Sequence, residues 1–112
     1  MKNKTHTESP SEFLFDFFLD RKTVLLYGAT SESRYMIKNY RQHISGIIDR
    51  KFLSNSTWEG IPCYNSPFEF CDVIFINCVT CDHTLDVEIL LKETSNFVIN
   101  FFDFIDLLLP NS

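Results

Sequence analysis

Short, uninterrupted apolar runs alternate with segments of helical periodicity along most of this chain. Residues 23–27 form the first run, which ends at Gly28, and residues 44–49 form the second, which ends at Asp49. Continuous apolar runs of this length are typical of strands that are buried on both faces of a sheet. The segment between them, residues 31–42, has its apolar positions at helical spacing. The pattern predicts a strand–helix–strand unit with a right-handed crossover.

Three further apolar runs predict three more strands. They span residues 61–64, 71–78 and 97–101. Segments of helical pattern follow the last two runs, at residues 82–95 and 103–109. Strands that alternate with helices favour a parallel sheet with helices on both faces. The predicted fold class is therefore α/β, a Rossmann-like three-layer α/β/α arrangement around a short, mostly parallel five-stranded sheet.

The N-terminal part of the chain changes character after a few residues. Residues 1–8 are polar and predict a flexible N-terminus that precedes a single Rossmann-like domain at residues 9–109. Ser9 and Glu12 have capping-box spacing, which predicts a helix over residues 10–20. This helix is apolar around nearly its whole circumference, whereas a helix that lies on one core has a single apolar stripe. We therefore expect something to cover its second face.

The chain has twelve phenylalanines, and their distribution strengthens that expectation. Six of them lie in the two end segments, outside the predicted strands: Phe13, Phe15, Phe17, Phe18, Phe102 and Phe104. Apolar surface without a partner is typical of protein interfaces. We predict a homodimer, or a complex with a partner protein, through these Phe-rich end segments.

Charge and apolar run length exclude two classes of partner. The 15 acidic residues exceed the 10 Lys and Arg and give a net charge of -5, which argues against a nucleic-acid ligand. The apolar run at residues 13–19 is too short for a signal peptide or for the roughly 20 residues of a membrane span. The sequence predicts a cytoplasmic protein with no nucleic-acid partner and no membrane span.

Four cysteines in a chain without a secretion signal predict reduced thiols. Cys78 and Cys81 form a C-x-x-C motif, so redox chemistry and zinc binding are alternatives to simple packing. A redox motif places its first thiol at a helix N-terminus, and structural zinc sites usually pair two such motifs. Cys78 falls at the end of a predicted strand instead. We therefore expect packing and assign no metal ligand.

The turn after the first predicted strand carries the strongest candidate site. Such a turn in a parallel sheet presents backbone N–H groups to an anion. Aligned on G-x-G-x-x-G, it keeps Gly28 but has Thr30 and Ser33 at the other two glycine positions. Asp49, 21 residues after Gly28, stands where a carboxylate would accept hydrogen bonds from ribose hydroxyls. The side chains on the turn disfavour a full dinucleotide such as NAD and favour a smaller anion.

The same residues have a purely structural interpretation. Thr30 or Ser31 can cap the helix that follows, and Asp49 can simply begin a polar loop. Glu32, one residue into the helix, would repel a phosphate if its carboxylate turned inward. Both interpretations stay open at the level of sequence.

Four segments carry a family resemblance: residues 22–29, 44–49, 60–64 and 71–76. Together they resemble the Rossmann-like domain at the N-terminus of bacillosamine-type sugar acyltransferases. They are also similar to the domain that accompanies some FkbM-type methyltransferases. The most particular element is the succession G-I-I-D followed by G-I-P. The resemblance implies a nucleotide-sugar ligand and a role in bacterial polysaccharide biosynthesis.

The resemblance also implies which residues contact the ligand. They belong to the first turn, the end of the second strand and the loop after the fourth strand: Gly28, Ala29, Thr30, Ser31, Asp49, Asn77 and Cys78. The transferase parts of those enzymes have no counterpart in this sequence. The resemblance therefore implies binding of a nucleotide or nucleotide-sugar without catalysis by the domain alone.

The one candidate catalytic residue is His83, which is expected near the meeting point of Gly28 and Asp49. No nucleophile elbow, zinc-protease motif or phosphate-binding loop motif occurs. The first hypothesis is therefore a nucleotide-binding or nucleotide-sugar-binding domain. The alternative is a degenerate Rossmann-like interaction or dimerisation module with no ligand, and the least favoured is a small NAD-dependent enzyme. The identity of the base or sugar stays open.

Overall fold

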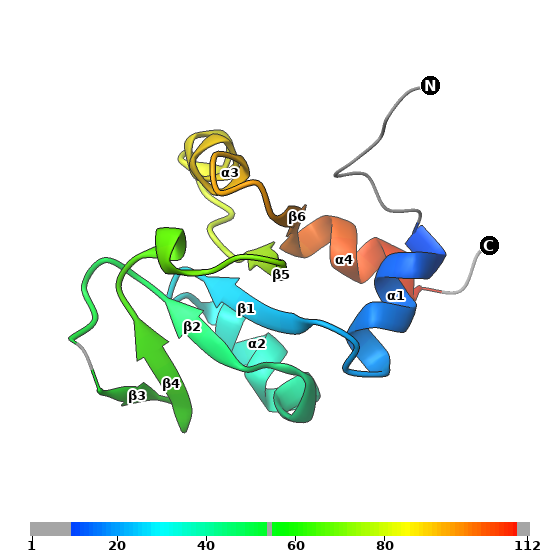
Figure 1. Cartoon of the computed structure of the whole chain (residues 1–112), viewed down its shortest axis with the longest axis horizontal. Coiled ribbons are helices and arrows are strands. Elements are labelled where there is room, and N and C mark those ends of the chain that lie inside the picture. Colours follow the sequence, from blue (N-terminus) through cyan, green and yellow to red (C-terminus); the bar gives the residue numbers. More distant parts are fainter. Residues whose placement is uncertain (1–9, 54, 110–112) are drawn as a thin grey trace.

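The computed structural model of the chain describes residues 10–53 and 55–109. Within these residues the fold is α/β, with a six-stranded sheet in the order β3-β4-β2-β1-β5-β6 (Figure 1). The strands are β1 (Thr23–Tyr27), β2 (Gly46–Ile48), β3 (Thr57–Trp58), β4 (Ile61–Tyr64), β5 (Val73–Asn77) and β6 (Phe97–Asn100). Neighbouring strands are parallel except for β3 and β4. The predicted α/β class and mostly parallel sheet are confirmed.

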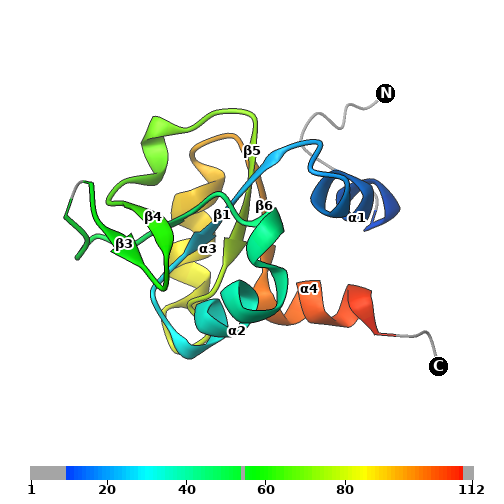
Figure 2. The same cartoon turned by 90° about the horizontal axis from the view of Figure 1, so that it is seen from below.

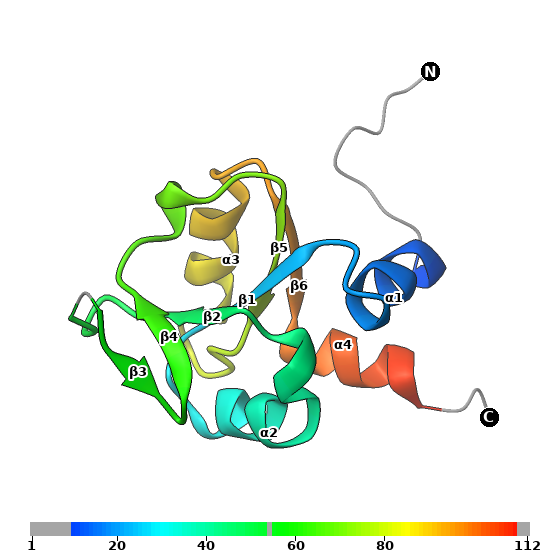
Figure 3. The same cartoon turned by 60° about the horizontal axis from the view of Figure 1, so that its bottom comes forward.

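The helices alternate with the strands as the sequence pattern predicts. They are α1 (Pro10–Phe18), α2 (Ser31–Tyr40), α3 (Thr84–Lys92) and α4 (Phe101–Leu108), with 3-10 turns η1 (Arg41–His43) and η2 (Pro67–Glu69). Figure 1 and Figure 3 show α3 on one side of the strands and α2 on the other. None of the helices in the described residues combines the length and the apolar character needed to cross a lipid bilayer.

The sheet separates two apolar clusters because successive side chains of a strand point to opposite faces. On β1, Val24 and Leu26 belong to the larger cluster, and Leu25 and Tyr27 belong to the smaller one. Helices α1, α2 and α4 contribute to the larger cluster, whereas α3 contributes Leu91 to the smaller one. The strand β1 is central, since it pairs with β2 on one side and along its whole length with β5 on the other.

Helices α1 and α4 lie next to each other at one end of the molecule (Figure 1, Figure 2 and Figure 3). Their contact is aromatic: the rings of Phe13 and Phe17 lie 5.8 and 5.0 Å from the ring of Phe104. These three side chains are fully buried. Phe15 and Phe102, in contrast, are 56% and 57% exposed. About half of the Phe-rich end segments thus serves the core of the monomer, and the rest remains on the surface.

The expectation of a five-stranded sheet is wrong because it omits β3. This strand has only two residues and pairs antiparallel with β4, with Trp58 opposite Ile61. The two residues between them, Glu59 and Gly60, both have positive φ, 52° and 81°. Positive φ at both residues is the requirement of a type I′ turn, one of the two common loops of two-residue hairpins. A run of two residues is too short to produce an alternating pattern, so the hairpin turn is the better sequence signal.

Several predicted boundaries shift by a few residues. Helix α1 ends at Phe18, and Asp20 has a left-handed φ of 55°, which ends the helical path before the predicted limit. Helix α3 occupies residues 84–92 of the predicted 82–95, and α4 begins at Phe101 rather than at residue 103. The predicted flexible segment at residues 1–8 and the cap at Ser9 lie outside the described residues.

Candidate functional site

A cavity of about 380 Å³ lies at the carboxyl ends of β1, β2 and β5, against α3. The chain runs from β1 outward through β2 and β4, and then returns to β5 on the other side of β1. The strand order therefore reverses at β1. Open parallel sheets bind ligands at this position. Polar side chains line part of the cavity: Tyr27, Asp49, Arg50, His83 and Asp86. Gly28 and the apolar side chains of Val79, Val87 and Leu90 line the rest.

Gly28 is required by the geometry of the turn after β1. Its φ is +97°, a conformation that L side chains rarely adopt, and an added Cβ would lie 2.6 Å from Cγ2 of Val79. Its N–H donates to the carbonyl of Ile48 at 2.7 Å. The glycine thus brings the ends of β1, β2 and β5 together at one edge of the cavity.

Thr30 caps helix α2. Its Oγ1 accepts a hydrogen bond from the N–H of Ser33 at 3.3 Å, and the N–H of Thr30 donates to Oγ of Ser33 at 2.7 Å, which completes a capping box. The Thr30 hydroxyl also donates to the carbonyl of Cys78 at 2.8 Å. Ser31 is exposed, and its hydroxyl donates to Oε1 of Glu32 at 3.2 Å. The capping interpretation of Thr30 is therefore confirmed, and the same hydroxyl ties α2 to the end of β5.

Asp49 bridges two turns through its carboxylate. Oδ2 accepts a hydrogen bond from the N–H of Ala29 and Oδ1 accepts one from the N–H of Lys51, each at 3.0 Å. The side chain is half-buried and lines the cavity. Because a carboxylate oxygen has two lone pairs, each oxygen keeps acceptor capacity after these bonds. Asp49 therefore holds the two turns together and still presents acceptors to the cavity.

Asn77 is fully buried and organises the loop after β5. Its Oδ1 accepts from the N–H of Val79 at 2.9 Å, and its Nδ2 donates to the carbonyl of Thr84 and to Oδ1 of Asn100. Glu88 extends this network by accepting from Nδ2 of Asn100 at 3.2 Å. Asn77 does not line the cavity; it positions Val79, which does.

Cys78 is also fully buried, and its side chain does not line the cavity. Burial, assisted by the negative charge of Glu32, raises the pKa of its thiol far above the ordinary range. A thiol that stays protonated is a poor nucleophile and a poor metal ligand. Cys81, the second residue of the C-x-x-C motif, is exposed, and both are unpaired thiols. Packing is the interpretation that this geometry favours for Cys78.

His83 lies at the mouth of the cavity, where the sequence places it beside Gly28 and Asp49. Its side chain is 74% exposed, and Nδ1 lies 3.9 Å from Oδ2 of Asp86. Tyr27 also lines the cavity; burial raises the pKa of its hydroxyl, and Arg50 offsets only part of this effect. The tyrosine is therefore neutral and can both donate and accept hydrogen bonds at physiological pH.

Sequence reasoning missed most of the cavity lining. Arg50 directly follows Asp49, so its position beside a candidate ligand carboxylate was the available signal. Val87 and Leu90 lie three residues apart on α3 and face the cavity together. Only the packing of α3 on the sheet reveals that this helix forms the apolar wall.

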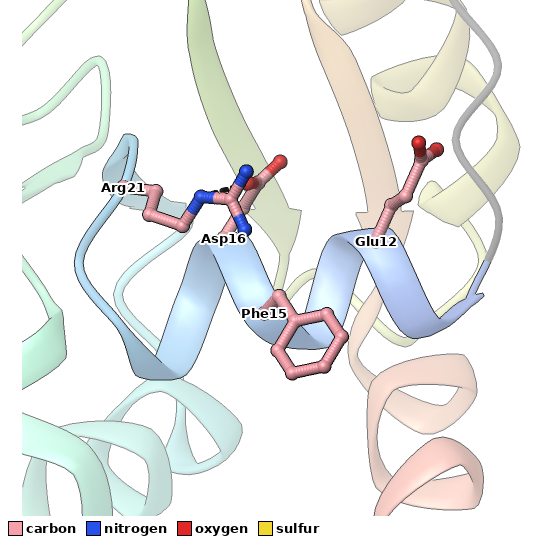
Figure 4. Close-up of a pocket in the computed structure, with 4 residues that line it drawn as sticks. All are labelled: Glu12, Phe15, Asp16 and Arg21. Atoms are coloured by element: carbon pink, nitrogen blue, oxygen red, sulfur yellow. Dashed lines mark ion pairs between the residues drawn. The ribbon is translucent and has the colours of Figure 1, made fainter.

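Two other hollows lie away from this edge. One, of about 280 Å³, is lined by Glu12, Phe15, Asp16 and Arg21 (Figure 4). In Figure 4 its side chains come from α1 and the turn after it, and an ion pair of 3.4 Å joins Arg21 to Asp16. The other, of about 290 Å³, lies near the amino end of β1 beside His43. No group of three or more His, Cys, Asp or Glu suited to a metal ion occurs among the described residues.

Comparisons of the chain with protein-family models, with curated proteins and with solved structures found no match. The resemblance to acyltransferase and methyltransferase-associated domains stays a prediction.

Proposed function

We propose that this chain is a Rossmann-like domain with three α/β/α layers that binds a nucleotide or nucleotide-sugar in the cavity beside Gly28 and Asp49. One observation carries the proposal: a carboxylate, a cation and an apolar wall converge in a single cavity at the edge where the strand order reverses. Cavities with apolar walls and a few convergent polar groups are the usual form of small-molecule sites.

Each part of a nucleotide has a complementary group in this cavity. The free lone pairs of Asp49 suit the vicinal hydroxyls of a ribose. The Arg50 guanidinium suits a phosphate, which it can bind through two parallel hydrogen bonds. Val87 and Leu90 offer apolar surface to a base, and the Tyr27 hydroxyl offers a hydrogen bond. The resemblance noted in the sequence supports a role in bacterial polysaccharide biosynthesis, with transfer chemistry supplied elsewhere.

Thermal shift with a panel of ligands tests the proposal. The panel contains UDP-sugars, CDP-sugars, NAD and plain nucleotides, each at millimolar concentration. A ligand present at about 100 times its dissociation constant raises the stability by about 2.7 kcal/mol, which is a readily measured shift. The absence of stabilisation by every member of the panel would falsify the proposed function.

Substitutions then locate the site. Arg50→Gln removes the cation from the cavity, and Lys38→Gln removes an exposed cation on α2 that does not line it. We expect the ligand-induced shift to fall in the first variant and to persist in the second. Asp49→Asn is a further variant, whose own stability without ligand must be measured because Asp49 also holds the turns. An equal loss in the Arg50 and Lys38 variants would place the ligand elsewhere.

The second candidate function is a Rossmann-like interaction or dimerisation module with no ligand. Three exposed apolar side chains favour it: Phe15 on α1, Leu19 directly after α1, and Phe102 on α4. Light scattering at tens of micromolar discriminates the two candidates together with the ligand panel. A dimer that no nucleotide stabilises supports this module, whereas a monomer refutes its dimerisation.

A further inference from the structure

The backbone N–H groups of the turn after β1, which a diphosphate would need as donors, already have hydrogen-bond partners within the protein. The N–H of Gly28 is bonded to Ile48, that of Ala29 to the Asp49 carboxylate and that of Thr30 to Oγ of Ser33. In dinucleotide sites these donors point at the pyrophosphate. Here the carboxylate of Asp49 takes the place of the anion at the Ala29 N–H. A diphosphate would have to displace a side chain of the protein to bind this turn.

The negative charge around the turn also disfavours a diphosphate. Glu32 lies at the second position of α2, and its negative charge raises the pKa of the buried Cys78 thiol, so its field reaches the loop after β5. Asp49 is the second carboxylate beside the turn. Two nearby negative charges oppose each additional negative charge on a ligand. The second phosphate of a diphosphate would therefore meet repulsion where dinucleotide sites offer N–H groups.

The cavity nevertheless offers one cation. Arg50 lines it, is exposed at its mouth, and is close enough to Tyr27 to lower the pKa of that hydroxyl. No ion pair to Arg50 occurs within the described residues, whereas Arg21 and Arg34 each have a carboxylate partner. An arginine without a carboxylate partner keeps its fork available for one phosphate group.

On this basis, and resting on the proposed function, we propose that the cavity selects ligands with a single phosphate. The ligand class is a nucleoside monophosphate, either free or as the nucleotidyl end of a sugar linked through one phosphate. The Arg50 guanidinium binds that phosphate, Asp49 binds the ribose and α3 covers the base. The volume of about 380 Å³ is at the small end of the range of about 300–1,000 Å³ for ligand sites, which agrees with one nucleoside.

Calorimetric titration of the whole chain tests this selectivity. The probes are uridine, UMP and UDP, then the same series with adenine and cytosine, and finally a CMP-linked sugar against a UDP-linked sugar. For the base that binds, we expect the monophosphate to bind at least about tenfold more tightly than the diphosphate. The affinities for the linked sugars, compared with those for the free nucleotides, show whether the ligand is a free monophosphate or a sugar-linked one.

Two variants assign the effect to its residues. Within the Arg50→Gln variant, the affinity for the monophosphate should fall to that for the nucleoside. Glu32→Gln removes a charge from the first turn of α2 and should raise the affinity for the diphosphate by several-fold. Glu93→Gln, which removes one charge at the C-cap of α3, should not. These readouts are affinity ratios within one variant, so a change in stability does not imitate them.

The outcomes separate the two proposals. Failure of every nucleoside and nucleotide to bind overturns the proposed function and this inference with it. A diphosphate that binds as tightly as the monophosphate, or a monophosphate preference that survives Arg50→Gln, overturns only the selectivity and leaves nucleotide binding standing.

Discussion

Replacement of Gly28 by alanine tests the central geometric claim about the site, which is that the turn after β1 packs directly on Val79. An alanine there has two costs. The first is the left-handed φ of +97°, which costs an L residue about 1–2 kcal/mol. The second is the approach of the new Cβ to Cγ2 of Val79 at 2.6 Å, about 1 Å closer than carbon atoms pack. Overpacking of this kind costs about 1–3 kcal/mol.

Gly60 provides a matched control. Its φ of +81° imposes a similar conformational cost, but the atoms nearest to an added Cβ belong to the guanidinium of Arg41, the far end of a flexible side chain, with Nη1 at 2.8 Å. The entropy that alanine removes from the unfolded chain is the same in both variants and cancels in the comparison. We expect Gly60→Ala to cost about 1–2 kcal/mol and Gly28→Ala to cost about 2–5 kcal/mol.

Urea denaturation measures both variants, and a double variant isolates the contact. Val79→Ala removes Cγ2, so the combination of Gly28→Ala with Val79→Ala should cost less than the sum of the two single changes. Binding of any ligand should weaken in Gly28→Ala because Val79 lines the cavity. Direct packing of the turn on Val79 is refuted if Gly28→Ala costs no more than Gly60→Ala. It is refuted as well if the costs of Gly28→Ala and Val79→Ala add within about 0.5 kcal/mol.

Three further predictions concern the core, the thiols and acid stability. Phe17→Ala should lower the unfolding free energy by about 3–5 kcal/mol, whereas Phe15→Ala should change it by less than about 1, since the first side chain is fully buried and the second is 56% exposed. A maleimide should label the exposed Cys81 within minutes and the buried Cys78 only after denaturation, as peptide mass mapping would detect. Hydrogen bonds from Lys92 and Asn100 lower the pKa of Glu88, so Glu88 stabilises the fold above its unfolded pKa of about 4.3 and loses this effect as the pH falls through the lower folded value. Glu88→Gln should therefore be less stable than the parent near pH 7, and melting curves should show the difference shrinking in acid.

Each of these has a clear contrary result. Equal costs for the two phenylalanine variants would mean that α1 does not pack on α4 as described. Rapid labelling of Cys78 in the native protein would contradict its burial. A stability difference for Glu88→Gln that stays constant from neutral to acid pH would show that its hydrogen bonds do not depend on its charge.

The sequence alone was enough to locate most of the strands and helices. The runs at residues 24–27, 73–76 and 97–99 are apolar for consecutive residues, which is typical of strands in a parallel sheet that is covered on both faces. The sequence pattern did not predict the hairpin strand β3, because two residues are too few to show a periodicity of apolar positions. Its turn at Glu59 and Gly60 was the only local signal.

Only part of the candidate site could be predicted from the sequence. Gly28, Asp49 and His83 could be placed at one edge because the carboxyl ends of parallel strands meet there. The sequence could not show that Asp49 already bonds to the N–H of Ala29, or that Asn77 and Cys78 are buried. Periodicity reports the tendency of a residue to be buried, but it does not identify its hydrogen-bond partner.

Tertiary structure decided everything that depends on contacts between distant residues. The Thr30 hydroxyl reaches the carbonyl of Cys78, 48 residues away, and Asp49 reaches back 20 residues to Ala29. The packing of α1 on α4 likewise separates a buried Phe17 from an exposed Phe15, although the local sequence treats both as apolar. The sequence therefore determined where the chain forms strands and helices, and the packing of those elements decided which donors, acceptors and rings remain available to a ligand or partner.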